Sequence, residues 1–263
     1  MEQSSIWLSI LSYQSAISWL LIASIVGVAL LMGLFVFING TSKLESGFTG
    51  RLIQRWSIRS VIVHWLGAIP CLILIFTGVV IGAGKVIFEP GSTHWAAAVK
   101  LSSTLHELAV FPFMAGALLM VIMWWKKQLF KKYDIDWFIK AGGYINFGKK
   151  QHPDAGFANG GEKLWFWVFT INFIILSATG LMLFFSEIAP TPENAPMVIS
   201  LHIISAMIIG AFAIVHIFMA TVISEGGLSN MITGKCDENW AKQHHNRWYK
   251  TINKNSNEVE KNG

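Results

Sequence analysis

Five long runs of hydrophobic residues divide the chain into alternating apolar and polar segments. Each run is about 20 residues long, the length that an α-helix needs to cross the hydrocarbon core of a bilayer. Lipid offers no partner for backbone polar groups, so a continuous apolar run of this length favours a membrane-spanning helix. The pattern predicts such helices over residues 17–38, 60–82, 104–125, 165–186 and 199–223.

The composition supports an all-α membrane protein. Of the 263 residues, 53% are hydrophobic and only 13% are charged, which is too apolar for an ordinary soluble domain. Residues 1–16 contain no Lys or Arg, so the first run lacks the positive segment of a signal peptide, and we expect it to stay as a helix. The net charge of +5 does not indicate a nucleic-acid partner, because the charges are gathered in the polar segments between the apolar runs.

The distribution of Lys and Arg predicts how the chain is oriented. Cytoplasmic segments of bacterial membrane proteins carry an excess of these residues. The polar segments carry none in 1–16, four in 39–59, two in 83–103, eight in 126–163, none in 186–198 and six in 224–263. We therefore expect a multi-pass protein of the bacterial cytoplasmic (inner) membrane, with a periplasmic N-terminus and a cytoplasmic C-terminus.

Two histidines interrupt the fifth apolar run, His202 and His216. They are 14 residues apart, which is about 21 Å along a helix, and both side chains project from nearly the same face. Ionisable side chains inside a membrane span are rare and indicate function. One helix therefore presents one imidazole near each surface of the membrane.

Two further histidines complete the pattern at the same two depths. With the predicted orientation, His64 lies near the inner surface with His216, and His106 lies near the outer surface with His202. Each pair draws on two different helices, as two stacked b-type haems in a helical bundle require. Two imidazoles on each iron leave no open position, which favours electron transfer over oxygen chemistry.

Other functions for intramembrane histidines fit the sequence less well. A proton relay usually includes carboxylates in the spans, and a transporter usually shows repeats and broken helices. A zinc site needs three or four ligands at one depth. The main alternative is that the histidines only lie at the membrane interface, with their ring nitrogens hydrogen-bonded, and bind no cofactor. Cys71 and Cys236 form no metal-binding spacing, and no CxxCH motif for covalent haem attachment occurs.

Several shorter motifs have structural interpretations. The sequences FTG at 76–78 and ATG at 178–180 favour close contact between helices. Asn159 before Gly160 and Gly161 is typical of a helix cap followed by a turn. His244 and His245 are adjacent, so on a helix they point apart and are expected to be surface residues.

With these residues in hand, the chain resembles the gamma subunit of membrane-bound formate dehydrogenases, a di-haem cytochrome b. The resemblance covers roughly residues 50–252 and includes HW at 64–65, LH at 105–106, the spacing of His202 and His216, ANGGEKLWFW, and GK…WAKQHHNRWY near the C-terminus. The run at 17–38 has no counterpart in the four-span form of this family.

The resemblance implies specific site residues. It makes His64, His106, His202 and His216 the axial ligands, and hence the metal ligands, of two haems b. It places a quinone site, for menaquinone or ubiquinone, at Asn159, Gly160 and Gly161 before the fourth span, with His216 alongside. No residue of this chain is expected to be catalytic toward formate.

The resemblance also implies partners. Formate oxidation would take place on a molybdenum- or tungsten-containing subunit, and an iron–sulfur subunit would deliver electrons to the outer haem. This chain would act as the quinone-reducing electron-transfer subunit within the lipid. Cytochrome b subunits of hydrogenases or thiosulfate reductases share the architecture and are the alternative. The predicted organisation is an N-terminal helix and connection (1–45), a four-helix di-haem bundle (46–225) and a cytoplasmic tail (226–263).

Overall fold

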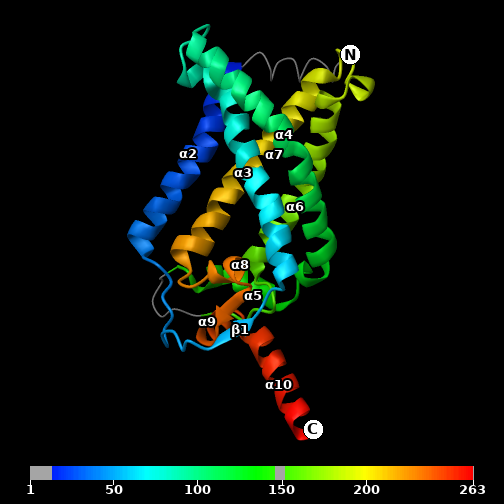
Figure 1. Ribbon diagram of the computed structural model, residues 1–263. Helices are drawn as coiled ribbons and strands as arrows, with labels where there is room; N and C mark the ends of the chain where they lie inside the picture. The colour runs from blue at the N-terminus through cyan, green and yellow to red at the C-terminus, as the bar shows by residue number, and fades with distance from the viewer. Residues whose placement is uncertain (1–13, 146–151, 263) are drawn as a thin grey trace. The chain divides into compact units, whose positions relative to one another are not determined.

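The computed structural model describes residues 14–145 and 152–262, with the backbone alone at 14–15 and 255–262. Within this part of the chain, five helices are long and apolar enough to cross a membrane, as Figure 1 shows in chain order. They are α2 (Gln14–Asn39), α3 (Ile58–Ile87), α4 (Thr93–Trp124), α6 (Gly160–Phe184) and α7 (Ala195–Phe218). The all-α fold class is confirmed, and the chain is a multi-pass membrane protein.

The helices extend beyond the apolar runs that predict them. Helix α4 begins at Thr93, eleven residues before the predicted start at residue 104. The added segment reads THWAAAVKLSS; its alanines are the strongest helix formers and extend the helix into more polar sequence. Helix α7 starts at Ala195 and continues after Phe218 as a π-helical turn, Met219–Ile223.

The chain forms two compact units, and the first is a bundle of the long helices. It contains the described part of Met1–Leu31 together with Val63–Leu119 and Val168–Val215. Helices α3 and α4 approach so closely that a Cβ on Gly116 would lie 2.4 Å from the backbone nitrogen of Gly67. Only glycine permits this approach, which is how small residues bring membrane helices together.

The additional N-terminal helix packs on this unit through its first half. The Ser18 hydroxyl donates a hydrogen bond to the Gly82 carbonyl of α3 at 2.9 Å, and Ile25 lies against Gly210 of α7. Farther along α2 the side chains are exposed, with Leu30 at 68%. An exposed apolar surface of this kind is suited to lipid.

The second unit holds the helix ends and the short elements, and it comprises Met32–Ile62, Met120–Trp167 and the described part of His216–Gly263. Its short helices are α5 (Tyr133–Ile139), α8 (Ser229–Ile232), α9 (Glu238–His244) and α10 (Asn246–Asn262), with 3₁₀ turns at Trp125–Gln128 and Ala141–Gly143. A further 3₁₀ turn, Ser186–Ile188, follows α6 and belongs to the first unit.

A two-stranded antiparallel ladder links the start of this unit to its C-terminal segment. Strand β1 (Leu52–Gln54) pairs with β2 (Lys235–Asp237), with Ile53 opposite Cys236. The apolar pattern did not predict these strands, because each has only three residues. Asp237 caps α9 and accepts hydrogen bonds from the backbone of Thr49 and Gly50. Burial of the Asp237 carboxyl acts to raise its pKa. The hydrogen bonds that it accepts outweigh this effect and lower the pKa below its usual value.

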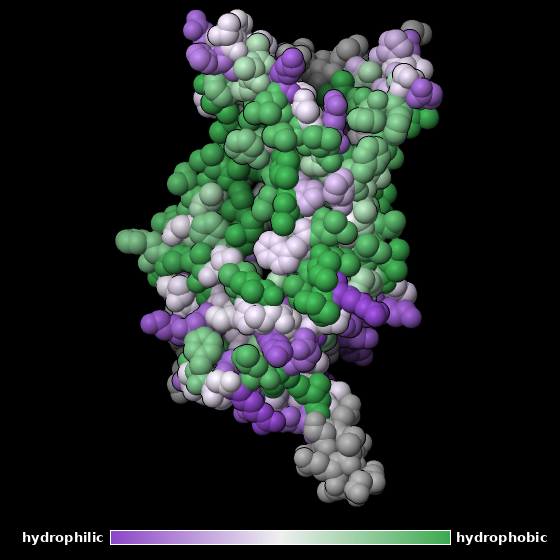
Figure 2. Space-filling view, in the orientation of Figure 1, coloured by the Kyte–Doolittle hydropathy of each residue, from purple (hydrophilic) through white to green (hydrophobic). Residues whose placement is uncertain are grey.

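Hydropathy divides the surface as a bilayer would. In Figure 2, hydrophobic residues cover the visible flanks of the long helices, while hydrophilic residues gather at the helix ends and on the short elements. Among the exposed apolar side chains are Phe37 (86%), Phe76 (70%) and Leu108 (68%). These side chains are stable in lipid and would be costly in water.

Candidate functional site

The outer pair of histidines is held by two threonines. His106 lies on α4, and its Nδ1 is 2.7 Å from the Thr77 hydroxyl on α3. His202 lies on α7, and its Nδ1 is 2.9 Å from the Thr179 hydroxyl on α6. Four helices of the first unit thus contribute one residue each to two equivalent hydrogen bonds.

The direction of these hydrogen bonds follows from the threonine hydroxyls. The Thr77 hydroxyl donates to the Ile73 carbonyl at 2.7 Å, and the Thr179 hydroxyl donates to the Ile175 carbonyl at 2.7 Å. A hydroxyl has one proton, so each threonine oxygen accepts from the Nδ1–H of its histidine. The neutral imidazole then carries its lone pair on Nε2, the nitrogen left for a metal.

A glycine follows each threonine and lies against the same imidazole. A Cβ on Gly78 would be 3.7 Å from Cε1 of His106, and a Cβ on Gly180 would be 3.3 Å from Cε1 of His202. We interpreted the two Thr-Gly sequences as sites of helix contact. In the structure, each of them lies against one of the two imidazoles.

The two outer histidines both belong to the first unit. Their common depth stays a prediction. All four intramembrane histidines are only partly buried as whole residues.

The inner histidines each lie beside a tryptophan. His64 on α3 meets the edge of Trp65, with ring centroids 5.2 Å apart and planes at 88°. His216 on α7 stacks on Trp165 of α6, at 5.4 Å and 20°. His64 belongs to the first unit and His216 to the second, so their pairing stays a prediction.

Asn159 caps helix α6. Its side-chain oxygen accepts a hydrogen bond from the Glu162 backbone N–H at 2.9 Å, and the Glu162 carboxylate accepts one from the Asn159 backbone N–H at 3.0 Å. This reciprocal pair is a capping box. The capping interpretation is confirmed, and it leaves the amide Nδ2 of Asn159 as the group that can serve a ligand.

The two glycines after Asn159 make room for a tryptophan. A Cβ on Gly160 would lie 2.7 Å from the Trp137 ring, and a Cβ on Gly161 would also lie 2.7 Å from it. Trp137 comes from α5, a helix that the apolar pattern did not predict. An indole therefore lies against both glycines at which the resemblance places the quinone site.

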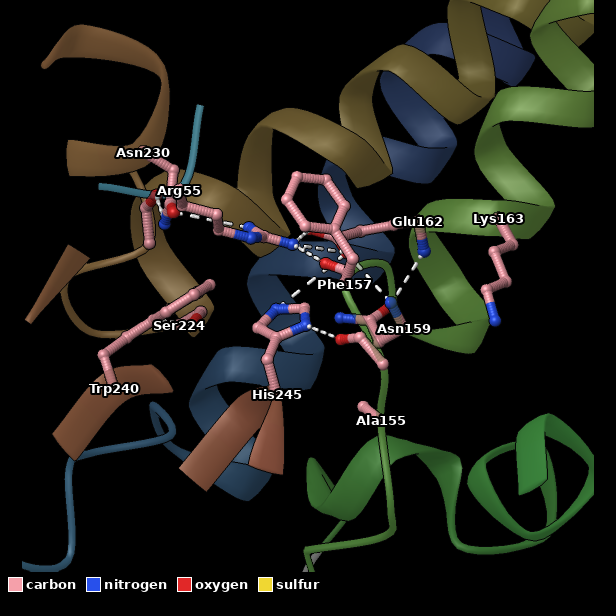
Figure 3. A network of polar contacts seen from close by, with 12 residues as sticks. Arg55, Ala155, Phe157, Asn159, Glu162, Lys163, Ser224, Asn230, Trp240 and His245 are labelled. Carbon is pink, nitrogen blue, oxygen red and sulfur yellow. Dashed lines mark hydrogen bonds and ion pairs between the residues drawn. The ribbon is translucent and has the colours of Figure 1, made fainter. Parts of the chain in front are cut away.

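Arg55 is the centre of a buried polar network in the second unit (Figure 3). Its Nη2 donates to both carboxylate oxygens of Glu162, at 2.9 and 3.0 Å, and to the Phe157 carbonyl at 2.6 Å. Its Nη1 donates to the Asn230 side chain at 3.3 Å. A hydrogen bond between an arginine and a carboxylate is strengthened by the two charges, and here one guanidinium nitrogen holds the carboxylate at the start of α6.

Aromatic rings surround the same guanidinium. Its carbon lies 5.2 Å from the ring centroids of Phe157 and Trp240 and 5.7 Å from that of Trp56. Rings at this distance stabilise a cation that has been removed from water. They come from three separate parts of the chain, so the arginine also links those parts.

The paired histidines of the C-terminal segment are buried, which corrects our expectation that they are surface residues. His245 is fully buried, and its Nδ1 donates to the Gly156 carbonyl at 2.8 Å. His244 is 6% exposed and stacks on Tyr144. Burial, reinforced by neighbouring charges, lowers the pKa of each to about 3, so both are neutral at physiological pH.

A second buried ion pair lies one turn into α6. The Lys163 ammonium is 2.7 and 2.8 Å from the two carboxylate oxygens of Asp134, and both side chains are 2% exposed. Lys163 was counted among the surface charges that set the orientation. The ion pair holds α6 to the segment at the start of α5.

Sequence reasoning missed several residues of these sites. The signal for Thr77 and Thr179 was the repeated Thr-Gly sequence. It occurs on α3 and on α6, and in each case the next long helix, α4 or α7, carries the histidine. No local signal marks Arg55 or His245, because their partners lie 107 and 89 residues away along the chain.

The chain is similar to known proteins over most of its length. A formate dehydrogenase cytochrome b556 subunit of Haemophilus influenzae is 28% identical over 219 residues, which cover 80% of this chain and 87% of the relative. The cytochrome b556(fdo) subunit of formate dehydrogenase from Escherichia coli K12 is 27% identical over 209 residues, 77% of this chain and 94% of the relative. The nitrate-inducible cytochrome b556(Fdn) subunit of formate dehydrogenase from the same organism is 25% identical over 158 residues, which cover 59% of this chain and 72% of the relative.

The match to a family covers all four intramembrane histidines. Residues 55–234 match the family described as prokaryotic cytochrome b561, and this segment includes α3, α4, α6 and α7 from their first turn onward. The match spans well over half of the chain and ends before α9 and α10. The chain belongs to the prokaryotic cytochrome b561 family.

Proposed function

We propose that this chain is the cytochrome b membrane subunit of a formate dehydrogenase, which passes electrons from an iron–sulfur subunit through two haems b and reduces quinone at the cytoplasmic side. The observation that carries the proposal is the outer histidine pair, in which both imidazoles have Nδ1 engaged and Nε2 left for iron. The names of the three relatives support formate dehydrogenase as the complex.

The outer site fits a haem b with two axial imidazoles. His106 and His202 would supply the ligands, and Thr77 and Thr179 would hold the rings. The glycines beside the rings leave space that a Cβ would reduce. A haem b held by these residues would supply one-electron transfer, and its two imidazole ligands would leave no position for substrate at the iron.

His64 and His216 would hold the second haem, near the inner surface. Each imidazole lies beside an indole, which limits how the ring can turn. The pairing draws its support from the depth predicted for the two residues and from the family to which the chain belongs.

Quinone would be reduced beside the inner pair, at the start of α6. The Asn159 oxygen is engaged in the capping box, so its amide N–H groups are the donors for a quinone carbonyl. Because Trp137 lies against Gly160 and Gly161, we place the ring at the Asn159 side chain, with His216 as its further contact, rather than on the glycines. Helix α6 begins at the surface rich in Lys and Arg, where cytoplasmic protons are available.

The orientation determines how energy is conserved. With the N-terminus in the periplasm, electrons move inward, from the outer to the inner histidine pair. Each electron that crosses the full membrane against the potential stores about 2.3 kcal/mol per 100 mV. The protons of quinone reduction come from the cytoplasm, so the charge separation is retained.

Purification of the complex through a tag on this chain tests the proposal. We expect mass spectrometry to find an iron–sulfur subunit and a molybdenum- or tungsten-containing subunit, and a haem assay to give two haems b per chain. Formate should reduce both haems. Co-purification with the subunits of a hydrogenase or thiosulfate reductase would show that the chain belongs to that complex instead. Absence of haem would refute the electron-transfer function.

A further inference from the structure

We propose that Thr77 and Thr179 are positioning residues for the outer haem. Each holds the Nδ1–H of one axial histidine, and together they set the tautomer, ring orientation and donor strength of both ligands. This inference rests on the proposed function, since it requires a haem between His106 and His202. It adds two residues that the search for ligands alone does not identify.

The two threonines occupy equivalent places in two hairpins. In the first hairpin, Thr77 on α3 precedes its histidine on α4 by 29 residues. In the second, Thr179 on α6 precedes its histidine on α7 by 23 residues. Each hairpin therefore carries a ligand on its second helix and the support for that ligand on its first. Two copies of one arrangement on the same site are difficult to explain by packing alone.

The hydrogen-bond chain is complete at each threonine. The imidazole N–H donates to the hydroxyl oxygen, and the hydroxyl donates to a carbonyl four residues earlier on its own helix. The second hydrogen bond polarises the hydroxyl and strengthens it as an acceptor. It also prevents the hydroxyl from turning to donate to Nδ1, so the tautomer with Nε2 free is the one selected.

The physical consequence is a stronger axial ligand. A metal-bound imidazole that donates its other N–H becomes more basic. A more basic ligand stabilises ferric iron more than ferrous iron, and this lowers the reduction potential. Both threonines act in the same direction on one iron, so their effects should add.

Redox titration of the purified complex tests this role. Thr77→Val and Thr179→Val keep the shape of the side chain and remove the acceptor, whereas Thr77→Ser and Thr179→Ser keep the hydroxyl. The control is Thr104→Val on α4, because Thr104 makes the same bond to a carbonyl four residues earlier, Lys100, and is exposed. The measurements are the haem content, the midpoint potential of each haem and the low-spin ferric EPR spectrum.

We expect each valine variant to retain two haems and to raise the outer potential alone. The expected change in the ferric-to-ferrous ratio is about threefold to tenfold, and a tenfold change corresponds to 59 mV for one electron. The double variant should shift by the sum, and its EPR spectrum should change. The serine variants and the Thr104 control should match the unmodified protein.

Two results would overturn the role of the threonines while leaving the proposed function intact. One is a valine double variant with two haems and an unchanged outer potential and EPR spectrum. The other applies if the valine variants lose haem: serine variants that lose it equally would show that any change of side chain at these positions disrupts the site, so that the hydroxyl has no specific role. Absence of haem from the unmodified protein would refute the proposed function itself.

Discussion

Removal of the buried ammonium at Lys163 should destabilise the second unit strongly. Lys163→Met keeps the length of the aliphatic stem and leaves the Asp134 carboxylate, 2% exposed, without its cation. Loss of one partner from a buried ion pair typically costs about 3–5 kcal/mol, because the remaining charge is desolvated and uncompensated. Almost no solvent screening applies, because both side chains are buried to the same extent.

The chain supplies a matched control in the exposed pair Lys140–Asp136. This pair has the same chemistry and a similar distance, 2.9 Å, but its side chains are 36% and 47% exposed. Exposed pairs of this kind contribute roughly 0–1 kcal/mol. Lys140→Met should therefore have almost no effect on stability.

The assay is thermal stability in detergent, followed by fluorescence-detected gel filtration after heating. Since 1 kcal/mol corresponds to about 2–4 °C for a protein near this size, Lys163→Met should lower the midpoint by roughly 6–20 °C. Lys163→Met combined with Asp134→Leu should recover most of this loss, because the orphaned charge is gone. Equal midpoints for Lys163→Met and Lys140→Met would refute the reasoning.

Three further predictions concern other parts of the molecule. Gly180→Ala should disturb the outer haem spectrum more than Gly78→Ala, since the new Cβ lies 3.3 rather than 3.7 Å from an imidazole carbon; equal spectra would contradict this. The folded-state pKa of His244 and His245, about 3, lies below the unfolded value, so their stabilisation is complete above about pH 6.5 and is lost as the pH falls. Each should lose roughly 1 kcal/mol between pH 7.5 and 5.5, a melting trend that a His244→Gln variant should weaken. Asn159→Ala should leave both haems reducible by formate but slow quinone reduction sharply, beyond the stability cost of about 1 kcal/mol for a lost cap; normal quinone turnover would remove Asn159 from the site.

The sequence was sufficient for the parts of the fold that depend on local pattern. Five apolar runs gave five long helices, because lipid imposes one solution on each run. The helix cap at Asn159 was also predicted, since a cap depends on residues within the first turn, and its partner Glu162 is only three residues away. The common depth of His106 and His202, inferred from helix rise and orientation, stays a prediction.

The parts that could not be predicted depend on contacts between distant residues. His245 is buried because Arg55 and the loop before α6 enclose it, and nothing in the local sequence HHNRW indicates this. Strand β1 forms only because β2, about 180 residues later, pairs with it. The Trp137 ring from α5 occupies the space beside Gly160. A glycine in the sequence suggests that a ligand can approach the backbone, but it does not show which distant side chain already lies there.

Haem content in four histidine variants tests the central claim most directly. His106→Ala and His202→Ala should each lose the outer haem and keep the inner one, while His64→Ala and His216→Ala should do the reverse. The measurement is a pyridine haemochrome assay with redox titration on each purified complex, and we expect one haem per chain in every variant. Two haems with unchanged potentials in all four variants would contradict the assignment of these histidines as ligands.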